Sequence, residues 1–538
     1  MEKTAQGKRF YPVLWGLFYF FIFALLLRGS FSYLDPDFGW HLKVGEEIAQ
    51  TWSVPNVNHY NYTFTGSWVD HEWLSNLAAY EIYSHFGYIA LSVLFALLIV
   101  VVLIILNIWA RRAYPESSPF LIIFLQLLGV VAASPHFGVR MQESGLLFLV
   151  LILLVIFFYN KSRNWRLLLI LLPLMYLWAC LHASFLIGFA ILFFLVGVKI
   201  FEKIIFPYFK RDWLDYSNIW KWREIAVFCA AVFGAVAVTL VTPYRLKLYS
   251  FLAGYKDNFY QAHIQEWLPQ FYYPFNYGQL LYLALAAAAV FFYIYYSQGK
   301  KRYWRLDIGT LGLAVVFIFL SFKSHRHFPL MFVVTFIFLV STFSSLFKIP
   351  RQAGDLRQSS WLNNYWLRGY ILFCLFLIAG LQLAATNFTA VPFSSFRSEY
   401  PVGAVNFLRE RPEYDSINIF NSYNWGGFLI WALPRRQLFI DGRLPQISYQ
   451  GQTFLEEYFD FFQKGAGIPK KLEDYKIGLV LLPVKDEEVY AKRWEQILFG
   501  ISNKNLLSHN YLRDYLNDSK DWQPIYYDRT AIIYSRVE

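Results

Sequence analysis

The stretch YPVLWGLFYFFIFALLLRGSFSYLDPDFGWHLKVGEE, residues Tyr11–Glu47, passes from a long apolar run directly into a polar cluster. Its first part, 11–30, is long enough to cross a bilayer, which takes about 20 mostly apolar residues. Asp35, Asp37 and His41 follow where that run ends. Ionisable groups beside a membrane span are candidates for a functional site. The stretch therefore predicts a membrane protein with either a polar cap or a reaction centre at one face of the bilayer.

The composition of the whole chain agrees with a membrane protein. The 538 residues are 57% hydrophobic and 16% charged, whereas soluble domains carry about 25% charged residues. The net charge of +11 comes from basic residues in short loops between apolar runs. That pattern indicates topology signals and argues against a nucleic-acid-binding face. The three cysteines lie in or beside apolar runs and are expected to pack in the core.

Hydropathy predicts a mostly α fold, a polytopic helical bundle over residues 1–390 with a first outer loop at 31–72. About eleven spans are expected, at 11–30, 87–110, 119–134, 144–160, 166–181, 184–201, 225–242, 278–297, 308–322, 328–346 and 369–386.

The loops between these spans alternate in charge. Every second loop, counted from the N-terminus, is rich in Lys and Arg, as in KSRNWR, GKKRYWR and KIPRQAGDLRQ. The intervening loops carry Asp, His, Glu and isolated Arg, as in DPDFGWH and FKSHRHF. Because cytoplasmic loops hold the excess of Lys and Arg, the N-terminus is predicted to be cytoplasmic. The polar candidates then all lie on the outer face.

The segment 391–538 is predicted to be a separate extracytoplasmic α/β domain. It alternates one helical pattern, 401–411, with apolar runs of strand length. The runs are INIF at 417–420, QLFID at 437–441, IGLVLLP at 477–483 and AIIYS at 531–535.

The first outer loop supplies the first candidate groups. A helix can begin after Pro36, and Asp37 and His41, four residues apart, then share a face. The apolar residues of another face predict a helix along the membrane surface, namely Trp40, Val44 and Ile48. Further on, GSWVDHEWL predicts Asp70 as an N-cap, with His71 and Glu72 in the first helical turn. A hydrated loop with capping acids is the alternative interpretation of these residues.

The later outer loops add cations and further polar groups, and each of these alone is more typical of a structural role. A span-end charge can extend to the interface, and His182 can simply join two helices. Together they indicate a site with carboxylates for base chemistry and cations for an anion. The candidates are Arg140, Gln142, His182, Arg245, Glu266, Lys323, Arg326 and His327.

This combination suits sugar transfer from a lipid-phosphate donor. A carboxylate at the membrane surface can act as general base toward the acceptor. Arg and Lys can hold the phosphate and stabilise it as it leaves.

The chain resembles a bacterial family of uncharacterised membrane proteins similar to the C-type (GT-C) glycosyltransferases. The matching pieces are DPDFGWHLKVGE, GSWVDHEWL, VRMQ, LWACLHASFLIG, TPYRLKLY, IQEWLP and NSYNWGGFLIWALPRRQLFIDGR. The family pattern usually has an aromatic residue at Gly39 and often a proline at Met141. The resemblance implies a polyprenyl-phosphate-sugar donor, a glycan, lipid or protein acceptor, and location in the bacterial inner membrane.

The resemblance also implies roles for the candidates. Asp37 is expected to be the base and Asp35 its helix-start support or a second ligand, with the reverse assignment open. His71 and Glu72 would shape the acceptor pocket, beside His41. The donor phosphate would be held by Arg140, His182 and Arg326. A divalent metal, Mg or Mn, is left open as a cofactor. Its oxygen and nitrogen ligands could come from Asp37, His41, His71, Glu72 and Glu266, with Asp37 and Glu266 first.

Two features of the tail carry structural interpretations. Gly426 and Gly427 are expected to permit tight packing, since the phosphate-loop ending is missing. Asp441 and Arg443 are expected to form an ion pair or to contact the acceptor. Against the transferase interpretation stand a lipid-linked-glycan flippase or transporter, a glycan polymerase, and a scaffold that presents the tail.

Overall fold

The computed structural model describes residues 2–208, 215–216, 219–256, 258–298, 307–348, 365–389, 392–396, 399–449, 451–464, 467–485, 491–500 and 510–537. The chain forms two compact units. Unit 1 consists of 1–32, 92–242 and 276–388, and unit 2 consists of 33–91, 243–275 and 389–538. Each unit is thus assembled from segments that lie far apart in the sequence. The basic loops 299–305 and 349–358 lie outside the described residues, as does part of 201–224.

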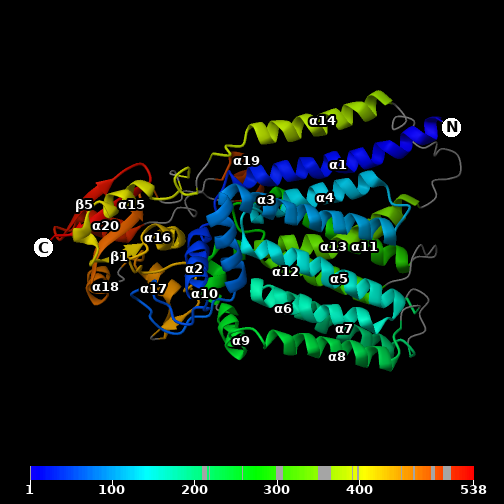
Figure 1. The fold of residues 1–538 in the computed structure, drawn as a ribbon, viewed down its shortest axis with the longest axis horizontal. Coiled ribbons are helices and arrows are strands. Elements are labelled where there is room, and N and C mark those ends of the chain that lie inside the picture. The colour runs from blue at the N-terminus through cyan, green and yellow to red at the C-terminus, as the bar shows by residue number, and fades with distance from the viewer. Residues whose placement is uncertain are drawn as a thin grey trace. The chain divides into compact units, whose positions relative to one another are not determined.

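Unit 1 is a bundle of long apolar helices that run side by side (Figure 1). Its helices are α1 (Glu2–Ser30), the second part of α3 (Trp73–Ala113), α4 (Pro119–Ala133), α5 (Ser144–Ser162), α6 (Leu171–Leu181), α7 (Phe185–Ile205), α8 (Trp222–Thr239), α11 (Tyr277–Gln298), α12 (Ile308–Lys323), α13 (Phe328–Lys348) and α14 (Tyr365–Ala384). Helix α1 packs along α14, α4 packs against α11 and α13, and α6 packs against α5 and α8.

Within the described residues, nine helices are long and apolar enough to cross a membrane. Two shorter apolar helices, Trp165–Leu181 and Ile308–Lys323, occupy the remaining expected positions. The predicted fold class, a polytopic helical bundle with a small C-terminal sheet, is confirmed. Helix α3 extends the expected span 87–110 toward the N-terminus, and its non-helical residue Gly87 (φ 73°) divides it.

Unit 2 is built around a four-stranded sheet of order β1-β4-β6-β5. Strands β1 (Asn418–Asn421) and β4 (Ile477–Pro483) are parallel, whereas β5 (Trp522–Tyr527) and β6 (Ala531–Arg536) complete the sheet antiparallel. The apolar runs 417–420, 477–483 and 531–535 supply three of these strands, as expected. The fourth expected run, 437–441, contributes only isolated bridges at Leu438, to Ile419 and to Asn61.

Short helices surround this sheet. They are α2 (Phe38–Thr51), the first part of α3, α9 (Leu246–Ala253), α10 (Asn258–His263), α15 (Val402–Arg409), α16 (Gly426–Ala432), α17 (Phe454–Asp460), α18 (Ile468–Asp474), α19 (Arg493–Phe499) and α20 (Tyr511–Asp518), with the small β2 (Ser448–Tyr449) and β3 (Gln452–Thr453) ladder. An aromatic core of Phe420, Phe439, Phe454, Phe461 and Tyr534 fills the space between sheet and helices.

The first outer loop joins this tail domain through backbone hydrogen bonds. The N–H of Leu438 donates to the carbonyl of Tyr60 at 2.9 Å, and the N–H of Tyr62 donates to the carbonyl of Leu438 at 3.3 Å. The hydroxyl of Thr63 donates to the carbonyl of Phe439 at 2.7 Å. The loop and the tail therefore form one folded body. The expected domain boundary at 390/391 stays a prediction.

Candidate functional site

The acidic pair at the start of α2 is held by its own turn. The N–H of Asp37 donates to the Asp35 carboxylate at 2.8 Å, and the N–H of Phe38 donates to the carbonyl of Asp35 at 3.1 Å. Helix α2 then begins at Phe38, as the proline at 36 predicted. Asp35 thus supports the helix start through its carboxylate. The Asp37 carboxylate is half-buried and takes no part in this turn.

The C-terminal segment forms a close wall around Asp37. A Cβ atom at Gly442 would collide with Oδ1 of Asp37, and one at Gly427 would lie 3.2 Å from the Asp37 Cα. A Cβ atom at Gly39 would meet the carbonyl oxygen of Gly427. The crossing of α2 and α16 is therefore too close for larger side chains. A side chain at Gly39 would therefore collide with the backbone of Gly427.

A chain of buried hydrogen bonds runs from His41. Its Nδ1 lies 2.6 Å from the Asn76 amide oxygen, which makes Nδ1 the donor. The Asn76 amide nitrogen donates to both oxygens of Asp70 at 2.9 Å. Glu72 lies between two imidazoles, 3.6 Å from Nδ1 of His41 and 3.2 Å from Nε2 of His71. The structure thus places the predicted candidates His41, His71 and Glu72 next to one another.

Two expectations for this loop are wrong in detail. Helix α3 begins at Trp73, so Asp70 is not its N-cap; its carboxylate instead accepts the N–H of Glu72 at 3.1 Å. The apolar face of α2 does not lie along a membrane surface. Trp40, Val44 and Ile48 are buried inside the protein, and α2 packs closely against α16.

Burial and mutual repulsion shift the pKa values of the acids. Burial, assisted by the negative charge of Asp35, raises the pKa of Asp37 to about 7, against the ordinary 3.8. Glu72 and Glu266 act in the same direction, while the Trp40 indole opposes them. Burial lowers the pKa of His41, so this imidazole is neutral near pH 7. A carboxylate that titrates near neutral pH is suited to take up a proton from a substrate.

Behind this wall lies a buried ion pair. Arg443 donates from Nε to Oδ1 and from Nη2 to Oδ2 of Asp441, both at 2.8 Å, and the pair is almost fully buried. Its guanidinium carbon lies 4.5 Å from the Tyr60 ring centroid and 4.8 Å from that of Trp68. Of the two expectations for Asp441 and Arg443, the internal ion pair is confirmed. The pair fixes the turn that carries Gly442.

Two later candidates belong to the same unit. Glu266 is close enough for its charge to raise the pKa of Asp37. Arg245 is exposed and precedes α9 with φ 49° and ψ −127°, a region that non-glycine residues rarely adopt. Such backbone strain occurs most often at functional sites.

The other candidates belong to unit 1. They lie in the turns between α4 and α5, α6 and α7, and α12 and α13, and comprise Arg140, Gln142, His182, Lys323, Arg326 and His327. Because successive helices run in opposite directions, these turns lie at one end of the bundle (Figure 1). Arg140 and His182 are buried there. Nδ1 of His182 accepts the N–H of Ser184 at 2.9 Å.

Sequence reasoning missed several residues of these clusters. Asn76 follows Glu72 by one helical turn, and its position at the start of an apolar helix was the available signal. In unit 1, the buried Gln279 bridges two imidazoles, with Oε1 2.7 Å from His325 and Nε2 3.5 Å from His136. The close approach of Gly442 to Asp37 had no local signal.

The carboxylates have the donor chemistry that Mg²⁺ prefers, but their arrangement does not complete a metal site. Among the described residues, no three His, Cys, Asp or Glu side chains lie close enough to hold one ion. Asp37 and Glu266 therefore stay predicted ligands.

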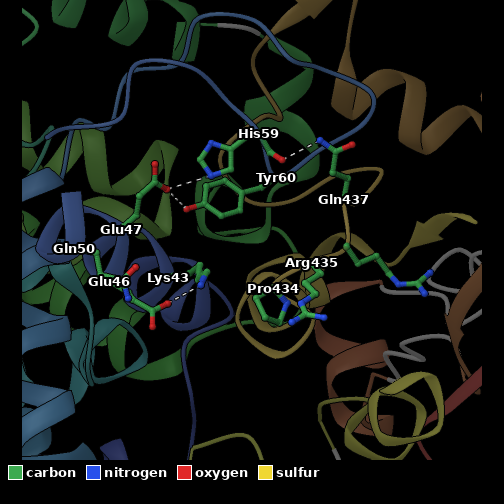
Figure 2. Close-up of a pocket in the computed structure, with 10 residues that line it drawn as sticks. Lys43, Glu46, Glu47, Gln50, His59, Tyr60, Pro434, Arg435 and Gln437 are labelled. Atoms are coloured by element: carbon green, nitrogen blue, oxygen red, sulfur yellow. Dashed lines mark hydrogen bonds and ion pairs between the residues drawn. The ribbon is translucent and has the colours of Figure 1, made fainter. Parts of the chain in front are cut away.

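A separate cavity of about 230 Å³ opens beside α2. Its walls are Lys43, Glu46, Glu47, Gln50, His59, Tyr60 and residues 434–437 (Figure 2). Glu47 is engaged by His59 at 3.2 Å and by the Tyr60 hydroxyl at 2.5 Å. At 100° per residue, positions 43, 46, 47 and 50 lie on the α2 face opposite to Asp37 and His41. The cavity is thus not part of the Asp37 cluster.

Comparison with known proteins identifies the fold. No family model matches the sequence, and no curated protein matches it. Crystal structures of the Archaeoglobus fulgidus oligosaccharyltransferase are similar in fold. The apo form has a TM-score of 0.51 at 12% identity over 86% of this chain and 69% of that one. The form tethered to an acceptor peptide has a TM-score of 0.51 at 12% identity over 98% and 74%.

A third structure is the archaeal oligosaccharyltransferase AglB from Archaeoglobus fulgidus, in complex with an inhibitory peptide and a dolichol-phosphate. It matches with a TM-score of 0.50 at 11% identity, over 88% of this chain and 69% of that one. With the apolar helices described above, these similarities show that the chain is an integral membrane protein with the GT-C fold of the archaeal oligosaccharyltransferase.

Proposed function

We propose that the chain is a membrane glycosyltransferase that moves a sugar or glycan from a polyprenyl-phosphate carrier to an acceptor outside the cytoplasm. The observation that carries this proposal is the Asp37 carboxylate. It is half-buried, its pKa is raised to about 7, and the close wall of Gly442 and Gly427 holds it in place. The shared fold and the dolichol-phosphate bound to AglB support a lipid-linked donor.

In this mechanism Asp37 removes the proton from the acceptor hydroxyl or amide as its oxygen or nitrogen bonds to the anomeric carbon. The bond between that carbon and the donor's phosphate oxygen breaks, and the phosphate keeps the electron pair. Asp35 supports the helix start, while His41, His71 and Glu72 shape the acceptor side. Arg140, His182 and Arg326 are proposed to hold the phosphate, because Arg binds it bidentately.

The orientation is part of the same proposal. The alternation of basic and polar loops supports a cytoplasmic N-terminus and an extracytoplasmic tail, and the resemblance to a bacterial family supports location in a bacterial inner membrane. The tail would then face the compartment in which the acceptor is presented.

The test is a transfer assay with the full chain in nanodiscs. Polyprenyl-phosphate monosaccharides and, separately, polyprenyl-pyrophosphate oligosaccharides serve as donors, and release of the lipid phosphate is measured. Asp37→Asn should lose at least a hundredfold in rate, as expected for loss of a general base. The matched control Glu46→Gln changes an acid of the same helix that pairs with Lys43, and it should retain activity.

Three outcomes would contradict the proposal. One is full activity in Asp37→Asn together with full activity in Asp35→Asn. Another is transbilayer movement of the lipid-linked glycan without cleavage, which would favour the flippase. The third is elongation of the lipid-linked glycan itself, which would identify a polymerase.

A further inference from the structure

Helix α19 has an inverted distribution of polarity. Its large apolar side chains are exposed, Trp494 to 44%, Ile497 to 75% and Leu498 to 71%, whereas its carboxylate Glu495 is exposed to only 4%. Residues 494, 497 and 498 lie three and four positions apart and so share one helix face. A helix at a water-facing surface places its apolar side chains inside and its charges outside. The exposed face of α19 is therefore poorly suited to contact with water.

The buried side of α19 binds it to the segment 271–275. The Tyr273 hydroxyl donates to the Glu495 carboxylate at 3.1 Å, and the ring centroids of Phe275 and Phe499 are 4.8 Å apart. That segment adds two exposed aromatic side chains, Phe271 and Tyr272. Both parts belong to unit 2, and these two contacts join the helix to the segment.

The position of the segment 271–275 in the chain indicates what the apolar face of α19 contacts. Helix α11, a candidate membrane span, begins at Tyr277, two residues after Phe275. The end of a span lies in the interfacial layer of the bilayer, where Trp and Tyr collect. The segment 271–275 is thus attached to the membrane boundary by its own backbone. Helix α19 follows it there through the contacts of Tyr273 and Phe275.

We propose that α19 and the segment 271–275 form a membrane-contact patch that inserts into the headgroup layer of the lipid bilayer. The patch consists of Phe271, Tyr272, Trp494, Ile497 and Leu498. Side chains of this kind enter about 5–10 Å into the boundary between headgroups and acyl chains. Lys492 and Arg493, both exposed at the helix start, suit the phosphates of anionic lipids. The patch would fasten the C-terminal part of unit 2 to the bilayer.

The test places nitroxide labels on the full chain in nanodiscs of phosphatidylcholine and phosphatidylglycerol. The background replaces Cys180, Cys229 and Cys374 by Ala, and labels are attached to Ile497→Cys and Leu498→Cys. The matched control is Tyr527→Cys, at a comparably exposed residue of β5 in the same unit. Collision rates with oxygen, which concentrates in lipid, and with a water-soluble nickel chelate are measured at each site.

At residues 497 and 498 we expect oxygen accessibility to exceed that of the nickel chelate, and the reverse at 527. Equal nickel accessibility at all three sites would overturn the proposal. Protection from both reagents at 497 and 498 would also overturn it, because a protein partner or a second copy would then cover the face.

A second variant keeps the proposal testable without labels. Ile497→Asp combined with Leu498→Asp changes two exposed residues and should leave the unfolding temperature in detergent unchanged. In nanodiscs, quenching of tryptophan fluorescence by lipids brominated near the headgroup should fall below that of the wild type. Unchanged quenching would contradict insertion. This result does not depend on glycosyl transfer, which the Asp37→Asn assay tests separately.

Discussion

At the scale of single residues, the proposed base, Asp37, is a carboxylate whose ionised form the fold disfavours. Asp37 is half-buried, and Asp35, Glu72 and Glu266 all add negative charge around it. His41 cannot offset that charge, because burial lowers its pKa and its Nδ1 is engaged by Asn76. The environment that raises the pKa of Asp37 also makes its ionised form costly for the folded protein.

That cost predicts a pH-dependent gain in stability on replacing Asp37. The pKa of Asp37 is about 7 in the folded protein and 3.8 ordinarily. Between these values the folded state binds more protons than the unfolded state, so its stability falls as the pH rises. Asn stays neutral, so Asp37→Asn should raise the unfolding temperature over wild type at pH 8 but not at pH 4. Thermal unfolding in EDTA measures this, with Glu46→Gln as the unaffected control.

An equal shift at both pH values would show that Asp37 ionises in the folded protein as readily as in water. The raised pKa would then be wrong, although the geometry around Gly442 would stand.

At the scale of elements, glycines set how closely the tail approaches the first outer loop. Gly39 and Gly427 allow α2 and α16 to cross in near-backbone contact, and Gly442 allows its turn to reach the Asp37 carboxylate. The Asp441–Arg443 pair then holds that turn in place. The tail therefore acts on Asp37 mainly by fixing the position of its carboxylate.

A methyl group at Gly442 should therefore displace the Asp37 carboxylate. Gly442→Ala is expected to lower kcat at least tenfold, equivalent to about 1.4 kcal/mol, with a smaller change in the KM for the donor. The matched control is Gly254→Ala, whose Cβ would meet its nearest neighbour, Gln446, at an ordinary 3.5 Å. Wild-type kcat in Gly442→Ala would exclude a positioning role for this turn.

A second element-scale device ties the ends of the unit 1 helices together. Nζ of Lys199 lies 2.8 Å from Glu202 in α7, both are buried, and the same nitrogen lies 5.4 Å from the Trp220 ring centroid. Arg163 lies 5.0 Å from that ring centroid. Because the pair is buried, removing either residue leaves an uncompensated buried charge, which destabilises the fold.

Glu202→Ala should thus destabilise the bundle by about 3–5 kcal/mol, since it leaves Lys199 charged and buried. The apparent unfolding temperature in detergent should drop clearly, while the paired variant Lys199→Met with Glu202→Leu should recover most of the loss. A wild-type unfolding temperature in Glu202→Ala would show that water reaches the pair.

At the scale of the whole molecule, the membrane-spanning architecture was predictable from the sequence. The packing of Gly427 and Gly442 against Asp37 was not. The expected spans agree with the helices, because each depends only on about 20 neighbouring residues. The cluster Asp35, Asp37 and His41 is equally local. In contrast, the approach of Gly442 to Asp37 joins segments near opposite ends of the chain. Such contacts arise from packing, which no periodicity in the sequence encodes.

The difference between local pattern and tertiary packing also explains two expectations that were wrong. The apolar face of α2 predicted a membrane-surface helix, but any apolar face is equally satisfied by protein, and α16 supplies it. QLFID has the composition of a strand, yet it makes only isolated bridges, because the loop around Asn61 bonds to Leu438 where a longer ladder would run.

Chemical rescue tests the central claim, that Asp37 is the base of a glycosyl transfer, most directly. In nanodiscs, Asp37→Ala should be inactive with a polyprenyl-phosphate-sugar donor and should regain transfer in proportion to added sodium formate, whereas sodium chloride at equal ionic strength should have no effect. Rescue of Asp35→Ala but not of Asp37→Ala, or wild-type transfer by Asp37→Ala without formate, would contradict the assignment.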